Sequence, residues 1–450
     1  MILPAEILDH VLSFLQDDAK SLRICFKASS SIVSLVERHL YAHIILLPRE
    51  PGDDHNDDHV RLNRSQLAVL LAKKPHIARY VKSIRVVIMS IDCGAWTLEN
   101  DQAASTEQDA SEPSEDSEPP YLPALKAFTL DYAPSDGSRE VSWNLLPVPL
   151  RSYMKKMIHV PSIEQVSLRR IQGFPSQALN GCPRLHRLHL CGGWCTDLKE
   201  ATSTSNQDEN LIRPEIHHFQ VGRGLYQMHN LASWFPQEPH DLASGTPDFS
   251  CLRSLEFRSK RNDFTLLSQM LNVCAETLEE LTIDLGKKFS TAYAATISSL
   301  DLTPSKSHPI SGTSVRNENF RMYEFTVPFT SQILEEIIQT RGGCALRSVV
   351  VKIHFSRLSY RSPSLAEMDF SSLAHIARPG SASRVDALSS SSPSVVSPSV
   401  GFLISPTKGG RHNSQEQVLL DVQRNQSLGP LVKDGKISLG FINEAWYYRG

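Results

Sequence analysis

A broad stripe of apolar side chains at helical spacing runs through the first fifteen residues. Pro4 suits the first turn of a helix, because its fixed φ is already helical and its missing N–H would have no partner there. Glu6 follows at the end of the helix dipole that favours an acidic side chain. The pattern predicts an amphipathic helix. Its apolar face consists of Ile7, Leu8, Val11, Leu12 and Leu15, with Phe14 beside them.

Two shorter apolar segments follow, at residues 22–26 and 32–41, and both are typical of helices. So small a unit of three helices has a high surface-to-volume ratio. It cannot bury this much apolar side chain within itself. Another surface must therefore cover the remainder.

These residues resemble an F-box over positions 1–46, which is about a tenth of the chain. A Phe-Leu pair ends the first helix, Cys25 follows a short second helix, and Ile32 stands where many relatives have a Trp. The remaining motif residues are Leu3-Pro4-Ala5-Glu6-Ile7-Leu8 at the start and Arg38-His39-Leu40-Tyr41 at the end of the third helix.

The resemblance implies that this module docks on the Skp adaptor of a Skp/cullin/F-box ubiquitin ligase, and through the adaptor on cullin. The alternative is a helical cap that seals the end of a larger domain, which needs the same apolar stripe and no adaptor. The expected adaptor-binding residues are Leu3, Pro4, Ile7, Leu8, Val11, Leu12, Leu15, Ile32 and Leu40.

A second pattern, apolar-x-x-apolar-x-apolar, occurs ten times between residues 41 and 351. It is the strand signature of a leucine-rich repeat, and its last two apolar positions alternate as in a short strand. Segments at helical spacing, such as residues 65–74, 264–274 and 331–339, separate the units. The units are Tyr41/Ile44/Leu46, Val81/Ile84/Val86, Leu125/Phe128/Leu130, Ile163/Val166/Leu168, Leu185/Leu188/Leu190, Ile216/Phe219/Val221, Leu252/Leu255/Phe257, Leu278/Leu281/Ile283, Met322/Phe325/Val327 and Leu346/Val349/Val351.

Alternating strands and helices predict an α/β fold with a parallel sheet. The array resembles the irregular leucine-rich repeats found behind F-boxes, which implies a curved solenoid. Its unit spacing is uneven, and the Asn that follows the strand in regular repeats is absent. The rival architecture is a doubly wound α/β domain, but no glycine-rich turn from strand to helix supports it.

Composition shifts divide the chain further. Acidic stretches near 50–58 and 99–118 are expected to be disordered insertions in the repeat region. Three Ser-Pro pairs follow residue 390, and they are consistent with a passive linker or with phosphorylation. The expected parts are the F-box-like helical module 1–46, the leucine-rich-repeat-like solenoid 47–379, a Ser/Pro-rich disordered linker 380–415 and a C-terminal cap of the solenoid 416–450.

The overall composition is that of an ordinary globular chain, with 40% hydrophobic residues and a formal net charge of −3 at pH 7. No basic run is interleaved with aromatic residues, so we expect no nucleic-acid partner. The apolar runs are too short to span a bilayer, so we expect no membrane association. Eight scattered cysteines fit a reducing compartment, which is cytoplasmic and/or nuclear.

The sequence contains no catalytic motif of the His-Glu-x-x-His or Gly-x-Ser-x-Gly type and no phosphate loop. We therefore expect no catalytic residue, no cofactor and no metal. An unrecognised hydrolase stays an alternative, since a triad assembled in space leaves no local motif. The nearest approach to a metal motif, whose spacing is not that of a zinc site, is His186, His189, Cys191 and Cys195.

The outward positions of the strand units form the expected target-binding surface. Basic residues lead in the earlier units and acidic residues in the later ones, so a partner with segregated charges could bind in one orientation. The sequence thus predicts a non-catalytic substrate-recognition subunit. A leucine-rich scaffold without ligase association is the alternative. The target-binding residues are Arg169, Arg187, His189, His218, Gln220, Glu256, Arg258, Glu280 and Asp284.

Overall fold

A computed structural model describes the chain in several segments. Leu3, Cys195, the Met322/Phe325/Val327 unit, the helix expected at 331–339 and both acidic stretches lie outside them. The described residues are 4–16, 18–28, 30–47, 59–89, 120–133, 140–191, 212–222, 231, 234–235, 247–259, 264–274, 276–285, 346–354, 399–405 and 415–441.

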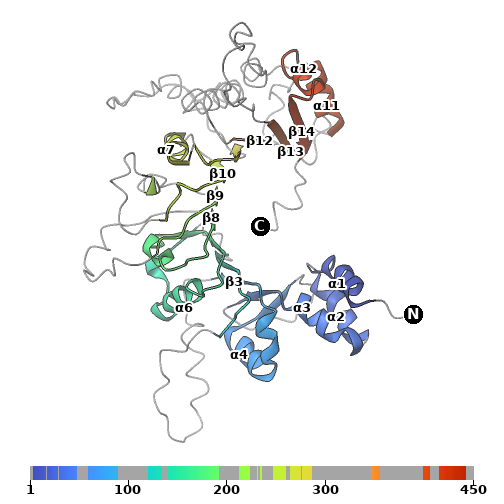
Figure 1. Ribbon diagram of the computed structural model, residues 1–450, viewed down its shortest axis with the longest axis vertical. Coiled ribbons are helices and arrows are strands. Elements are labelled where there is room, and N and C mark those ends of the chain that lie inside the picture. The colour runs from blue at the N-terminus through green and yellow to red at the C-terminus, as the bar shows by residue number, and fades with distance from the viewer. Residues whose placement is uncertain are drawn as a thin grey trace, which may run out of the picture. The chain divides into compact units, whose positions relative to one another are not determined.

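The fold is α/β and contains an open parallel sheet of twelve strands (Figure 1). From β3 to β14 the order of strands in the sheet follows their order in the chain, and β1 lies between β2 and β3. The strands are β1 (His43–Leu46), β2 (Val60–Leu62), β3 (Ser83–Ile88), β4 (Ala127–Tyr132), β6 (Gln165–Arg169), β8 (Arg187–Cys191), β9 (His218–Gly222), β10 (Ser254–Ser259), β11 (Glu280–Leu285), β12 (Ser348–His354), β13 (Ser399–Ser405) and β14 (Ile437–Phe441).

Two compact units divide the chain, and the boundary between them falls within β9. The first unit holds the strands up to β8, a small sheet of β5 (Val141–Ser142) and β7 (Ile171–Gln172), and several of the described helices. Its helical segments are α1 (Ala5–Ser13), α2 (Ala19–Ala28), η1 (Ser30–Ile32), α3 (Val33–Leu40), α4 (Arg64–Lys73), η2 (Pro75–Arg79), η5 (Trp143–Leu145), α6 (Val148–Ile158) and η6 (Ser176–Leu179).

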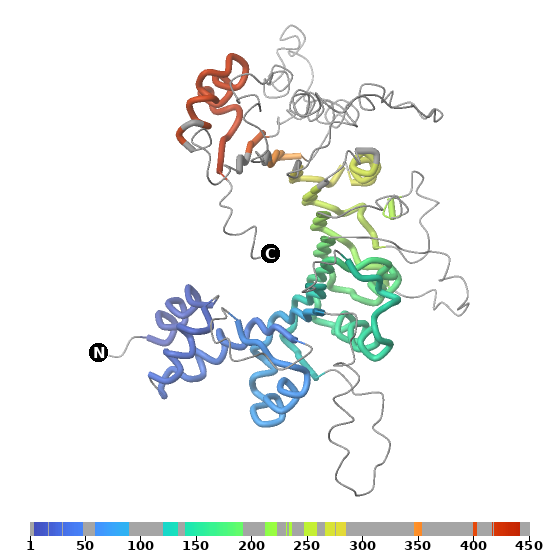
Figure 2. Tube along the Cα trace, turned by 180° about the vertical axis from the view of Figure 1, so that it is seen from behind, coloured from blue at the N-terminus to red at the C-terminus, as the bar shows by residue number. Residues whose placement is uncertain are grey.

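Burial alternates along the whole of β8, whereas β3, β4 and β6 each contain three consecutive buried residues. In β8, Leu188 and Leu190 are fully buried, whereas Arg187 is exposed and His189 is half-buried. Helices α4 and α6 lie on the same side of these strands (Figures 1 and 2), and the guanidinium of Arg64 in α4 lies 5.0 Å from the centre of the Tyr153 ring in α6. At β8 the alternation therefore favours one covered and one open face of the sheet.

Nine of the ten predicted strand units coincide with strands, β1, β3, β4, β6 and β8 to β12. Their last two apolar positions are at most 1% exposed in every case. Each pair packs on the covered side, where an apolar side chain leaves water. The strand periodicity and the parallel sheet are thus confirmed.

The second unit contains β10 to β14 with α7 (Phe264–Cys274), α11 (Gln415–Arg424) and α12 (Leu428–Lys433). Strand β13 lies inside the segment 380–415, so the expectation of a disordered linker is wrong there. Val400 and Phe402 are 2% exposed, and the strand pairs with β12 and β14. The buried Val400 and Phe402 alternate as in the other strands, although the surrounding stretch is rich in Ser.

Candidate functional site

The N-terminal module, helices α1 to α3, has a small apolar core of its own. Leu12 of α1, Leu22 of α2, and Val36 and Leu40 of α3 are all at most 8% exposed, and they pack with Val60 of β2. Burying a leucine side chain contributes about 1.5–3 kcal/mol. These residues therefore hold the three helices together and against the first strands.

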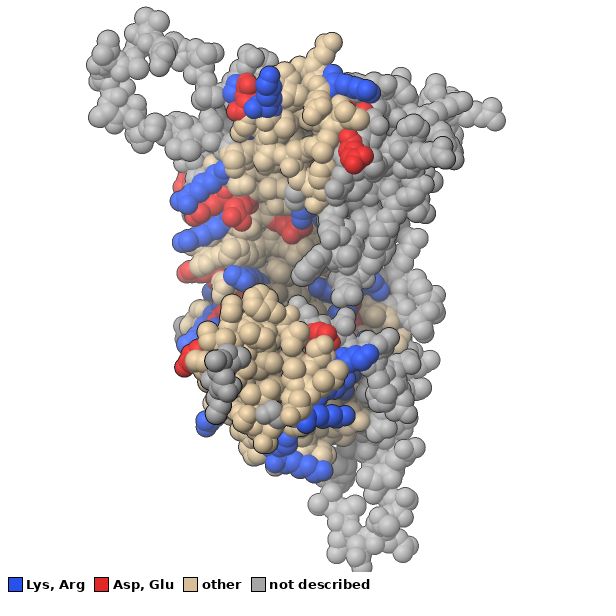
Figure 3. Space-filling model, turned by 90° about the vertical axis from the view of Figure 1, so that its right-hand side faces the viewer, with Lys and Arg blue, Asp and Glu red and all other residues tan. Residues whose placement is uncertain are grey.

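A second set of apolar residues in the same module stays in water. Ile7 and Val11 of α1, and Phe14 at its C-cap, are 49%, 50% and 76% exposed, and Ile24 of α2 is 61% exposed. The first three residues are spaced i, i+4 and i+7, so they share one face of the helix and its C-cap. Figure 3 shows a broad area with few charged side chains over this module, in the lower half of the view. Exposed patches of this kind mark interaction surfaces.

The predicted adaptor-binding residues are therefore divided between core and surface. Ile7, Val11 and Pro4 are exposed and Leu8 is half-buried, whereas Leu15 and Ile32 lie partly buried against the core. The placement of Leu12 and Leu40 on the docking surface is wrong, because a stripe this wide also supplies the packing between the helices.

Ile24 is exposed in α2 and was not among the predicted adaptor-binding residues. Its position relative to Leu22 could have indicated it. In a helix, residue 24 points about 160° away from the buried Leu22, so an apolar side chain there cannot serve the same core. An apolar residue at such a position indicates a second contact surface.

Polar contacts join α1 to α3, and another set caps the start of α2. Asp9 of α1 forms ion pairs with Arg38 and His39 of α3, and its carboxylate oxygen lies 2.7 Å from His39 Nε2. The hydrogen bond with His39, followed by that with Arg38, holds the pKa of Asp9 below its usual value. Asp18 accepts hydrogen bonds from the backbone N–H and the hydroxyl of Ser21, at 2.9 and 2.6 Å. Asp18 thus caps the first turn of α2.

A buried carboxylate joins this module to the next part of the first unit. Glu37 of α3 is 3% exposed and accepts hydrogen bonds from Lys74 Nζ, at 2.6 Å, and His76 Nε2, at 2.9 Å. Burial alone would raise the pKa of Glu37, but the hydrogen bonds from Lys74 and His76 outweigh it and leave the pKa below its usual value. The orientation of the module is therefore tied to the segment that links α4 to η2.

The open face of β6 and β8 brings together three of the predicted target-binding residues. The parallel register pairs Gln165 with Arg187, Ser167 with His189, and Arg169 with Cys191. Arg169, Arg187 and His189 therefore point to the same face of neighbouring strands. His218 and Gln220 of β9 are half-buried and occupy the corresponding alternate positions.

Two of the predicted acidic residues in the second unit form ion pairs with cations on other strands. Asp284 of β11 is fully buried and forms an ion pair with Arg258 of β10, so its placement on an exposed acidic surface is wrong. Glu256 accepts a hydrogen bond from Lys352 Nζ at 2.6 Å. Glu280 is exposed. The alternation of the strand predicted the face of these side chains, but not that a cation on the adjacent strand would neutralise Asp284.

Among the described residues, no helix is long and apolar enough to cross a membrane, and no group of three or more His, Cys, Asp or Glu side chains could hold a metal ion. Burial raises the pKa of the Cys182 thiol to about 12, so this cysteine stays protonated at neutral pH.

Comparison of the chain with models of known protein families, with curated proteins and with solved structures gave no match.

Proposed function

We propose that the chain is a substrate-recognition subunit of a Skp/cullin/F-box ubiquitin ligase. The observation that carries the proposal is the exposed apolar face of α1 and α2, formed by Ile7, Val11, Phe14 and Ile24. Exposure of such side chains is costly unless a partner covers them. The F-box motif residues that surround this face favour the Skp adaptor as that partner.

The parallel sheet supplies the second half of the proposed function. We assign target binding to the face of β6, β8 and β9 that carries Arg169, Arg187 and His189, in an irregular leucine-rich solenoid. The ubiquitin transfer itself belongs to other subunits. The role of this chain is to hold the target near the charged ubiquitin carrier, which makes the transfer effectively intramolecular.

The test uses the purified full-length chain and a purified Skp adaptor in a pull-down and a titration by calorimetry. The variant Ile7→Asp/Val11→Asp places two carboxylates on the exposed face, and neither residue belongs to the module core. We expect adaptor binding to weaken at least a hundredfold, since charges in an apolar contact stay desolvated and unpaired.

The matched control is Leu145→Asp/Val148→Asp, which changes two apolar residues that are 61% and 66% exposed and lie outside the module. It should bind the adaptor like the unmodified chain. If the unmodified chain does not bind the adaptor, or if the Ile7/Val11 variant binds it equally well, the ligase assignment is wrong. A leucine-rich scaffold without ligase association would then remain.

A further inference from the structure

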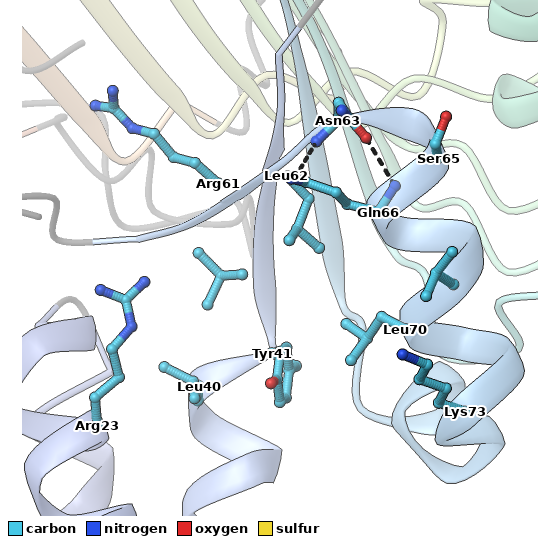
Figure 4. Close-up of a pocket in the computed structure, with 12 residues that line it drawn as sticks. Arg23, Leu40, Tyr41, Arg61, Leu62, Asn63, Ser65, Gln66, Leu70 and Lys73 are labelled. Carbon is cyan, nitrogen blue, oxygen red and sulfur yellow. Dashed lines mark hydrogen bonds between the residues drawn. The ribbon is translucent and has the colours of Figure 1, made fainter. Parts of the chain in front are cut away.

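An open groove lies between the N-terminal module and the first strands and helix of the sheet region, within the first unit. Its volume is about 520 Å³, within the roughly 300–1,000 Å³ of typical binding sites. Figure 4 shows Arg23 on one side, Leu70 and Lys73 on the other, and Leu40 and Tyr41 between them. The groove is lined by Arg23, Leu40, Tyr41, Val60, Arg61, Leu62, Asn63, Ser65, Gln66, Val69, Leu70 and Lys73.

The charges in this lining have one sign. Arg23 from α2, Arg61 from β2 and Lys73 from the last turn of α4 contribute three cations, and none of the twelve lining residues is Asp or Glu. Arg23 and Lys73 lie on opposite sides of the apolar floor, and an anionic occupant would be attracted by both. The electrostatics therefore select an acidic ligand.

The floor of the groove is apolar and recessed. Leu40 and Val60 are 8% and 6% exposed, whereas Val69 at the edge is 50% exposed. A flat membrane surface cannot reach side chains that lie below their surroundings, but the side chain of a peptide can. Leucine or phenylalanine anchors of a peptide would enter this floor, while its carboxylates meet the cations.

The polar end of the groove is already ordered. Asn63 and Gln66 form a capping box at the start of α4, in which Asn63 Oδ1 accepts from the Gln66 backbone N–H at 2.7 Å and Gln66 Oε1 accepts from the Asn63 backbone N–H at 3.0 Å. Burial raises the pKa of Tyr41, so its hydroxyl stays protonated and able to donate. The walls are thus preorganised, which lowers the entropic cost of binding.

We propose that this groove binds an acidic peptide segment of a partner protein, anchored by large apolar side chains. The site is distinct from the exposed face of α1, because it uses neither Ile7 nor Val11. It therefore does not depend on the proposed contact with the adaptor.

The experiment probes the full-length chain with an array of fluorescent dodecapeptides that vary the spacing of Asp and Glu relative to Leu and Phe. A matched array replaces Asp and Glu by Asn and Gln. We expect saturable binding of acidic members alone, weakened by added salt because the cations are at the rim. Fluorescence anisotropy then measures the dissociation constants of the acidic members.

Charge reversal at the rim tests the site itself. Arg23→Glu/Lys73→Glu should raise the dissociation constant at least tenfold, whereas Lys20→Glu/Lys27→Glu makes the same charge change on exposed residues of α2 outside the groove and should leave it unchanged. Val69→Asp should weaken binding at the apolar edge of the groove, with Val148→Asp as its control. Hydrogen exchange of the variants checks that the module is still folded.

Four outcomes would overturn the proposal. No member of the acidic array binds; the neutral array binds equally; the two charge-reversal variants lose binding equally; or the groove mediates a different contact. The last case is recognised when Arg23→Glu/Lys73→Glu abolishes sedimentation with phosphatidylserine vesicles, or abolishes self-association in analytical ultracentrifugation, without any effect on peptide binding.

Discussion

Removal of the charge on Glu37 should loosen the N-terminal module without disturbing the second unit. In Glu37→Gln the side chain keeps its shape, but the carboxylate that accepts from Lys74 and His76 is lost. Breaking a fully buried ion pair costs about 3–5 kcal/mol. The partners Lys74 and His76 are 41% and 50% exposed and can return to water, so we expect about 1–2 kcal/mol here.

The assay is amide hydrogen exchange followed by mass spectrometry, which reports local opening. A loss of about 1–2 kcal/mol makes exchange in peptides covering α3 and α4 roughly 5- to 30-fold faster. Peptides covering α7 and β11 should not change. The matched control is Glu164→Gln, which removes the more exposed Glu164–Lys126 pair at 2.8 Å and should cost less than about 1 kcal/mol.

The same variant predicts a pH dependence. The pKa of Glu37 in the folded chain lies below its ordinary value of 4.5, so the ion pair stabilises the fold above that value and is lost as the pH falls through the folded pKa. The difference between variant and unmodified chain should shrink as the pH falls below 4.5, because the carboxylate of Glu37 is then protonated. Equal exchange at pH 7, or a difference that does not shrink below that pH, would refute the role of Glu37 in holding the module in place.

Three further predictions concern the fold. Leu22→Ala should destabilise the module by about 2–5 kcal/mol because Leu22 is fully buried, whereas Ile24→Ala should change stability by less than about 0.5 kcal/mol; chemical denaturation measures both. In Gly401→Ala the new Cβ would lie 2.8 Å from Ser438 Oγ, so α11–β14 peptides should exchange faster, and adding Ser438→Ala should restore protection. Cys182 should resist iodoacetamide in the native chain at pH 8 and react on unfolding, since burial raises its pKa to about 12.

The strand units could be predicted because every unit places two alternate apolar side chains in the core of the sheet. These residues are at most 1% exposed in the nine described units. Strand β13 was not predicted, because its local sequence is not typical of a strand. Its residues Val400 and Phe402 satisfy the same rule, but Ser and Pro dominate the surrounding stretch, and pairing with two neighbouring strands overrides local propensity.

The candidate site was less predictable, because a contact surface depends on neighbours that are distant in the sequence. Helical spacing groups Leu12 with Val11, yet Leu12 meets Leu22 and Val36 while Val11 meets water. Strand alternation likewise places Asp284 on the open face, but it cannot show that Arg258 of the adjacent strand is there to pair with it. The groove has no sequence motif, since its cations come from three separate elements.

Both proposed contacts use residues of helix α2. The variants of one contact therefore also test whether the other contact is independent. Arg23 lines the groove and Ile24 belongs to the exposed apolar face, so adjacent residues serve different surfaces about 100° apart on the helix. If the surfaces are independent, Ile7→Asp/Val11→Asp abolishes adaptor binding and preserves peptide binding, and Arg23→Glu/Lys73→Glu has the reverse effect. If each variant abolishes both contacts while hydrogen exchange shows α2 still folded, the adaptor and the peptide compete for one continuous surface. The groove and the exposed apolar face would then not be separate sites.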